Sequence, residues 1–150
     1  MEAKDLKKLF VVLLLSITTL SFAQQNVSAP QKFALVIGNS NYTGISRLNN
    51  PVNDANDMEA ALRGLGFTVE KILDGTLEQM ENAVLNLSRR LGASRDSYGF
   101  FFYAGHGVQS SGENYLIPVQ ANDIRSEALL RSRAVPLQFV LYYGRCSERT

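Results

Sequence analysis

Cysteine, histidine and tryptophan are nearly missing from this sequence. Its 150 residues include one cysteine, Cys146, one histidine, His106, and no tryptophan. A single cysteine excludes an internal disulfide, and one histidine with one cysteine cannot build a metal site from nitrogen and sulfur ligands alone. We therefore expect no metal site of this kind, and we expect no cofactor.

The chain also lacks an excess of charge of either sign. Lysine and arginine total 15, aspartate and glutamate total 14, and the formal net charge is +1. No basic cluster alternates with aromatic residues, so nucleic acid is not an expected partner. The sequence has neither a glycine-rich phosphate loop with its lysine nor a Gly-x-Ser-x-Gly turn, which argues against a nucleotide hydrolase and a serine hydrolase.

Residues 1–23 have the order of a secretory signal peptide. Lysines come first, an apolar stretch follows over 9–20, and the small residues Ser21 and Ala23 precede a cleavage point. The stretch is short for a membrane span, which needs about 20 apolar residues. We expect cleavage after Ala23 and export to the periplasm or the medium, with 24–31 as a polar tether and no membrane span left. An uncleaved anchor is the alternative.

Apolar runs of strand length alternate with amphipathic segments in the rest of the chain. The runs cover 32–39, 67–73 and 98–105. The last of them is apolar almost throughout, which predicts burial on both of its faces. The order strand, helix, strand, helix, strand predicts an α/β fold with a mainly parallel sheet and helices on both faces.

Helical spacing marks the amphipathic segments between these runs. The first starts at Val52 and repeats apolar residues on one face, at Ala55, Met58, Leu62 and Leu65. The second starts with Thr76 and Gln79 in capping-box spacing, followed by an apolar stripe at Leu77, Met80, Val84, Leu87 and Leu91. Glycines predict that the two helices end near Gly64 and Gly92.

Residues suited to chemistry follow the first and third apolar runs. Gly38-Asn39 ends one, and Gly105-His106-Gly107 ends the other. Parallel α/β sheets bind ligands at the carboxyl ends of their strands. An imidazole at that place can exchange a proton near neutral pH, and a glycine beside it lets a substrate approach the backbone closely. The plainer alternative is a histidine in an ordinary turn after a strand.

Four stretches carry a resemblance to a known family: KFALVIGNSNY, LNNPVNDANDMEAALRGLGF, FFFYAGHGVQSSGENYLIPVQA and RAVPLQFVL. In this order and spacing they resemble the bacterial branch of the caspase and metacaspase superfamily of cysteine peptidases. The resemblance covers 32–141 and implies a partial caspase-like (p20) domain, a three-layer α/β sandwich, followed by an atypical tail over 142–150. It also implies a Cys-His dyad that cleaves protein or peptide substrates.

The resemblance assigns roles to three residues. His106 falls on the catalytic histidine, and the backbone N–H of Gly107 falls on the oxyanion hole. Asp54, in VNDA, falls on an acidic position of the S1 pocket, which implies a preference for arginine or lysine at P1. The alternative for Asp54 is a carboxylate that favours the first turn of a helix. Ala104 stands where some relatives have serine, which implies the loss of one polar contact to substrate.

Calcium activates some metacaspases, but no run of alternating acidic residues in this chain resembles a calcium loop.

The nucleophile is the main departure from the family. Its cysteine follows the histidine by about 50 residues, which lies beyond Thr150. Cys146 comes only 40 residues after His106 (146 − 106). Either 139–143 form a strand and Cys146 is the nucleophile, with Arg145 favouring its thiolate, or PLQFVL begins a helix and the chain lacks the nucleophile. We expect the second, which leaves the fold incomplete at its C-terminal end and the third strand with an unpaired edge.

The sequence therefore predicts the histidine-bearing part of a secreted caspase-like cysteine endopeptidase, inactive by itself. A non-enzymatic caspase-like module that binds peptides in the same cleft is the alternative.

Overall fold

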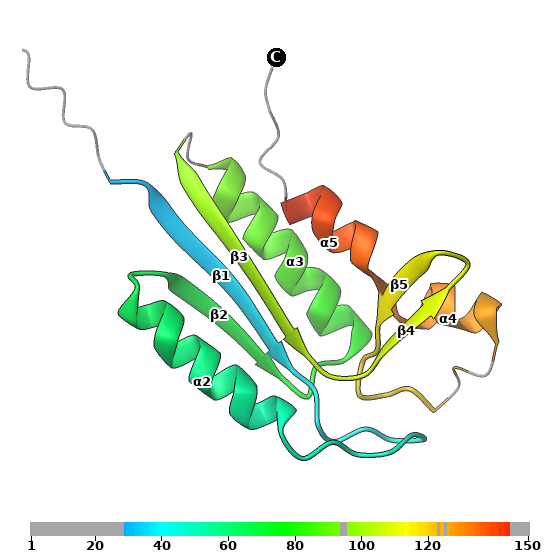
Figure 1. The fold of residues 1–150 in the computed structure, drawn as a ribbon. Coiled ribbons are helices and arrows are strands. Elements are labelled where there is room, and N and C mark those ends of the chain that lie inside the picture. The colour runs from blue at the N-terminus through cyan, green and yellow to red at the C-terminus, as the bar shows by residue number, and fades with distance from the viewer. Residues whose placement is uncertain (1–28, 94–95, 123, 125, 145–150) are drawn as a thin grey trace, which may run out of the picture.

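A parallel sheet of three strands, in the order β2-β1-β3, forms the centre of the molecule (Figure 1). The computed structural model describes residues 29–93, 96–122, 124 and 126–144. The strands are β1 (Gln31–Gly38), β2 (Thr68–Leu73) and β3 (Ser97–Ala104). The expected signal peptide and Cys146 lie outside the described residues.

Helices cover both faces of this sheet. α2 (Pro51–Gly64) lies on one face, and α3 (Leu77–Gly92) with α5 (Leu137–Gly144) lies on the other (Figure 1). The α/β architecture expected from the sequence is therefore confirmed. So is the capping box of α3, because Gln79 N–H donates to Thr76 Oγ1 at 3.3 Å and Thr76 N–H donates to Gln79 Oε1 at 2.9 Å.

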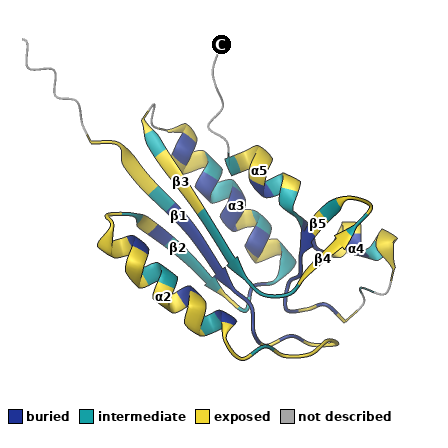
Figure 2. Ribbon diagram, in the orientation of Figure 1, coloured by how far each residue is buried: buried dark blue, intermediate teal, exposed yellow. Residues whose placement is uncertain are grey.

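The alternation of β1 divides the core between the two faces of the sheet. Ala34 and Val36 pack with the apolar face of α2, whereas Leu35 and Ile37 pack with α3 and α5. Side chains of a strand point to opposite faces in turn, so a central strand that is apolar on both sides binds two helical layers at once. Figure 2 shows β1 as the most completely buried strand of the sheet.

The expectation that β3 is buried on both faces is wrong, because its first half is largely exposed and its second half is only half-buried. Tyr98 is 59% exposed and Phe100 is 38% exposed, whereas Phe101 and Tyr103 pack against the core shared with α3. The cause is position, because β3 is an edge strand that pairs with β1 alone among the described strands. Within the described part of the chain, the other edge of β3 therefore has no partner strand.

Near the helix ends one expectation fails and one alternative is excluded. Leu65, expected on the buried face of α2, is 64% exposed because the helix ends at Gly64 and Leu65 is its C-cap. The interpretation of 139–143 as a strand is also wrong, since these residues belong to α5. The helix begins at Leu137, within PLQFVL, as the resemblance implied, and Pro136 belongs to the preceding strand.

A small antiparallel sheet, which the sequence did not predict, follows the parallel one. Its order is β4-β5-β6, with β4 (Gly107–Ser110), β5 (Glu113–Leu116) and β6 (Val135–Pro136), and α4 (Glu127–Arg133) leads into β6. A second, smaller core lies beside it, formed by Tyr42, Tyr115, Ile117, Val119, Ala121, Leu130 and Ala134. None of the described helices is long and apolar enough to cross a membrane.

Candidate active site

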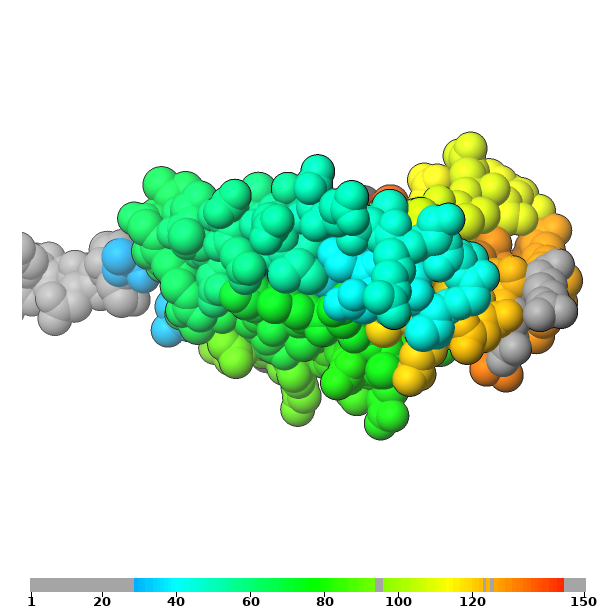
Figure 3. All heavy atoms as spheres, turned by 90° about the horizontal axis from the view of Figure 1, so that it is seen from below, coloured from blue at the N-terminus to red at the C-terminus, as the bar shows by residue number. Residues whose placement is uncertain are grey.

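The carboxyl ends of β1 and β3 lie level with each other. Gly38 is the partner of Ala104 in the parallel register, and Asn39 N–H donates to Ala104 O at 2.9 Å. The chain therefore leaves both strands at the same edge of the sheet. In Figure 3 the loop over 39–50, in cyan, lies beside the yellow and orange segments that follow β3.

Gly38 allows the first turn of α2 to reach this edge. A Cβ at Gly38 would lie 2.5 Å from Pro51 O and 2.6 Å from Ala55 Cβ, so no larger residue fits. The close approach of Gly38 to Pro51 and Ala55 places the start of α2 directly beside the end of β1. It also brings the N-terminus of that helix, with Asp54, to the end of the sheet where the histidine lies.

The imidazole of His106 is held by the loop after β1. Its Nε2 lies 2.8 Å from Ser46 O, and its ring meets the ring of Tyr42 edge-on with centroids 4.6 Å apart. A carbonyl oxygen only accepts hydrogen bonds, so the contact requires Nε2 to carry the proton. In the neutral ring Nδ1 is then the acceptor, with a lone pair available to a thiol or a water.

Tyrosine hydroxyls fix the main chain of His106. Its N–H donates to Tyr42 Oη at 2.8 Å, and its carbonyl accepts from Tyr103 Oη at 2.7 Å and from Ile117 N–H at 3.0 Å. Burial raises the pKa of both tyrosines above the ordinary value of 10.0. Both hydroxyls therefore remain protonated and able to donate at neutral pH.

Asn39 completes this buried network. The side chain is fully buried; its Oδ1 accepts from Gly75 N–H at 2.8 Å and its Nδ2 donates to Ile117 O at 3.1 Å. Among the described residues no buried polar side-chain atom lacks a partner. Because a satisfied polar network specifies one arrangement of the groups in it, the ends of β1, β2 and β5 are fixed relative to one another.

The glycines on either side of His106 have different reasons. A Cβ at Gly105 would lie 2.5 Å from the hydroxyl oxygens of both Tyr42 and Tyr103, so this position has no room for a side chain. A Cβ at Gly107 would meet only Tyr115 O, at 3.6 Å, which is an ordinary contact. Gly107 is exposed and begins β4, so its backbone is open to a ligand from solvent.

Asp54 lies in the first turn of α2 with an exposed side chain. Within the described part of the chain, its carboxylate has no hydrogen-bond or ion-pair partner. This position is consistent with the alternative interpretation of Asp54, in which the carboxylate stabilises the N-terminus of the helix. It also leaves the carboxylate free for a cation from outside.

Sequence reasoning singled out His106, Gly107 and Asp54, and missed the residues that hold the histidine. Tyr42 and Ser46 contact His106 from a segment far away in the sequence, whereas Tyr103 contacts its carbonyl from only 3 positions away. The available signal was a polar or aromatic residue directly after each buried strand, as in GNSNY and FYAGHG. No group of three or more His, Cys, Asp or Glu side chains gathers in the described residues as a metal site requires.

The sequence also matches a known family over most of this structure. The family description is the caspase domain, and it matches residues 31–139. That range contains the parallel sheet, the loop over 39–50 and the histidine. The chain belongs to the caspase domain family.

The sequence is also similar to individual proteins. Mucosa-associated lymphoid tissue lymphoma translocation protein 1 of Homo sapiens is 40% identical to this chain over 103 residues, and its homolog in Mus musculus is 39% identical over 103 residues. In both cases the match covers 68% of this chain and 12% of the relative. The chain thus spans a small part of the length of these proteins.

Proposed function

We propose that this chain is the histidine-bearing part of a caspase-like cysteine endopeptidase, and that His106 is its acid–base residue. One observation carries the proposal: within a caspase domain, the imidazole of the only histidine is fixed by Ser46 O at 2.8 Å. This contact leaves Nδ1 as the nitrogen that exchanges protons. The described residues include no cysteine, so the nucleophile of the dyad comes from outside them.

The proposed reaction has two steps. The thiolate attacks the peptide carbonyl carbon, a C–S bond forms, and the electron pair moves to the oxygen, which the backbone N–H of Gly107 stabilises. The His106 imidazolium gives its proton to the departing amide nitrogen as the C–N bond breaks. In the second step the neutral imidazole takes a proton from water, whose oxygen displaces the sulfur and releases the acid.

We further propose that Asp54 selects arginine or lysine at P1. The support is an exposed carboxylate without a partner, at the end of the sheet where His106 lies. A guanidinium or ammonium group would gain a charge-assisted hydrogen bond there. No cofactor is required by the reaction as proposed, and the substrate is a protein or peptide. The order of lysines, apolar run and small residues over 1–23 supports export to the periplasm or the medium.

The experiment compares two proteins. The first is the chain itself, which should neither cleave a fluorogenic arginine peptide nor react with a thiol-directed peptide warhead. The second continues the chain after Gly144 with the corresponding segment of a caspase-domain relative, including its cysteine, and should cleave the peptide.

In the extended protein, His106→Ala should lower kcat by about 100-fold or more, the usual contribution of a positioned acid or base. Full activity of the His106→Ala variant would disprove the assignment. Peptide binding without cleavage by both proteins would support the non-enzymatic module instead. Cleavage by the chain alone, abolished in Cys146→Ala, would make Cys146 the nucleophile.

A further inference from the structure

Asp74, directly after β2, has a backbone conformation that its residue type does not favour. Its φ is 52°, and Ser111 is the only other non-glycine residue with positive φ in the described part of the chain. This left-handed region costs energy for residues with a Cβ, least for aspartate and asparagine. Glycine would adopt it freely, yet the glycine stands one position later, at Gly75. A side chain retained at such a position indicates a task for that side chain.

The carboxylate of Asp74 binds the start of the loop after β1. Its Oδ1 accepts from Ser40 N–H at 2.8 Å and from Asn41 N–H at 2.9 Å, and its Oδ2 accepts from Asn41 Nδ2 at 2.6 Å. Hydrogen bonds to a charged acceptor are shorter and stronger than neutral ones. Partial burial acts to raise the pKa of Asp74, but the bonds from Asn41 and Ser40 outweigh it and leave the pKa below its ordinary value of 3.8.

The loop that Asp74 holds is closed on itself. Ser40 O accepts from Tyr42 N–H at 3.0 Å and from Leu48 N–H at 3.1 Å, so the segment between them forms a compact ring of backbone. That ring contains Ser46, whose carbonyl contacts the imidazole of His106. It also begins with Tyr42, whose hydroxyl accepts the His106 N–H. The two hydrogen bonds and the ring contact that the loop makes to the histidine therefore all depend on where the base of the loop is fixed.

We propose that Asp74 is a positioning residue of the active site: its carboxylate fixes the base of the loop over 39–50, which presents Ser46 O and Tyr42 Oη to His106. The inference rests on the proposed function, because a fixed imidazole matters for acid–base chemistry. Asp74 acts through the loop, since its own hydrogen bonds go to Ser40, Asn41 and Gly38 and none to the histidine.

The single histidine makes a direct test possible in the chain as it exists. Nitrogen-15 spectra at alkaline pH, where the imidazole is neutral, report which ring nitrogen carries the proton. In the wild-type chain Nε2 should be fully protonated, because Ser46 O can only accept. Asp74→Gly removes the carboxylate and also the backbone strain. Its ring signals should move toward those of a histidine in an unstructured peptide while the amide signals of β1 and β3 keep their positions.

Asp74→Asn tests the same contacts without a change of backbone preference. The amide keeps one oxygen to accept from the Ser40 and Asn41 N–H groups, but its NH₂ group faces Asn41 Nδ2, and two donors cannot form a hydrogen bond. We therefore expect a displacement of the ring signals between those of the wild type and Asp74→Gly. Ser111→Gly is the matched control. It relieves the other left-handed residue, whose Oγ donates to Glu127 Oε1 at 2.6 Å and does not touch the loop. Its ring signals should equal those of the wild type.

Wild-type ring signals in a folded Asp74→Gly chain would overturn the proposal, and so would an equal displacement in Ser111→Gly. If Asp74→Gly does not fold, Asp74→Asn decides, and unchanged ring signals in that variant overturn the proposal. None of these readouts needs peptidase activity. An inactive extended protein would thus refute the proposed function and leave the role of Asp74 standing. Unchanged ring signals in the Asp74 variants would refute the role of Asp74 and leave the proposed function standing.

Discussion

His106 Nε2 lies 2.8 Å from Ser46 O, although the two residues are 60 positions apart in the chain. The contact joins the end of β3 to the loop after β1, which leave the sheet at the same edge. It determines which ring nitrogen carries a proton and which can accept one. The chemistry of the only histidine is therefore set by a backbone carbonyl from another segment.

Gly105 and Gly107 should respond differently to alanine. In Gly105→Ala the new Cβ would press on the hydroxyl oxygens of Tyr42 and Tyr103, which are held by the His106 backbone. We expect a loss of about 1 to 3 kcal/mol in the free energy of unfolding, as for other overpacked sites. Gly107→Ala should change it by less than about 0.5 kcal/mol. Urea unfolding of both variants measures the difference, and equal losses would contradict this account of the two glycines.

Removing the hydroxyl of Tyr103 should weaken the support of the histidine backbone. Tyr103→Phe deletes the donor to His106 O and Ile117 O, each of which keeps another partner. We therefore expect a loss of about 1 kcal/mol in the free energy of unfolding. Tyr98→Phe, on the exposed part of the same strand, is the control and should be neutral. The prediction fails if both variants unfold at the same urea concentration as the wild type.

Asp54 should determine the preference at P1 in the extended, active protein. Because a bound arginine side chain would cover the exposed carboxylate and desolvate the pair, Asp54→Asn should cost about 2 to 4 kcal/mol of transition-state binding for an arginine substrate, a decrease of about 30- to 1,000-fold in kcat/KM. Asp57→Asn is the control, because Asp57 is also exposed on α2. Steady-state kinetics with arginine and aspartate peptides measure the preference. An enzyme that prefers aspartate, or that ignores Asp54→Asn, would refute the role.

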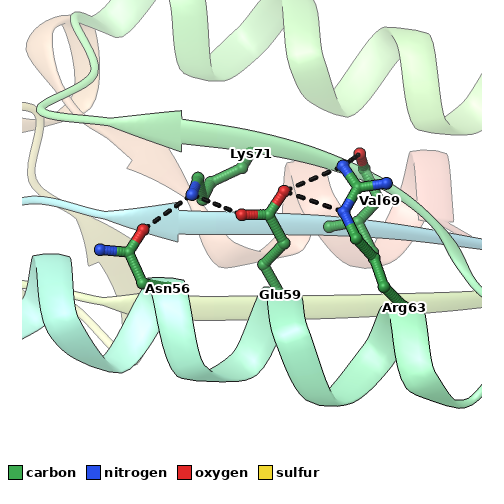
Figure 4. Close-up of polar contacts among 5 residues, drawn as sticks. All are labelled: Asn56, Glu59, Arg63, Val69 and Lys71. Atoms are coloured by element: carbon green, nitrogen blue, oxygen red, sulfur yellow. Dashed lines mark hydrogen bonds and ion pairs between the residues drawn. The ribbon is translucent and has the colours of Figure 1, made fainter.

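Glu59 should make the stability of the protein depend on pH. Its carboxylate joins α2 to β2, with Oε1 accepting from Arg63 Nη2 at 2.9 Å and Oε2 paired with Lys71 Nζ (Figure 4). These hydrogen bonds, from Lys71 first and Arg63 second, hold the pKa of Glu59 below its ordinary 4.5.

A lowered folded-state pKa adds stability that is present above the unfolded pKa and is lost as pH falls through the folded one. Glu59→Gln should therefore cost about 1 kcal/mol or less at neutral pH and nothing in strong acid. Glu81→Gln is the control, because Glu81 lies beyond the first turn of α3 and has no ion-pair partner among the described residues. Unfolding curves over a pH series test whether the free energies of unfolding of Glu59→Gln and the wild type become equal in acid. A difference that stays constant at every pH would contradict the prediction.

Export should remove the first 23 residues. We expect the secreted protein to begin at Gln24, because small residues precede that position and an apolar run precedes them. Amino-terminal sequencing of protein from the periplasm or medium measures this. Leu13→Arg, in the middle of the apolar run, should keep the protein inside the cell. An intact Met1 on exported protein would show that the segment is not cleaved.

The sequence by itself determined the order of the main elements and the place of the histidine. Hydrophobic period and turn residues are local properties, so the parallel sheet, the capping box at Thr76 and the strand-end position of His106 could all be predicted from them. The family resemblance rests on motifs of the same local kind. It gave the caspase-like class and the assignments of His106, Gly107 and Asp54.

Only the tertiary structure decided what holds the histidine and which faces are covered. Asn39, Tyr42, Ser46 and Asp74 each act on a partner far away in the sequence. Their places after strands mark Asn39 and Tyr42 as candidates, but no local pattern shows which residue each one contacts. The exposure of Phe100 also follows from the neighbours of β3 and not from its apolar sequence. A pattern along the chain fixes which residues can be buried or can bond, whereas packing alone fixes which segments meet.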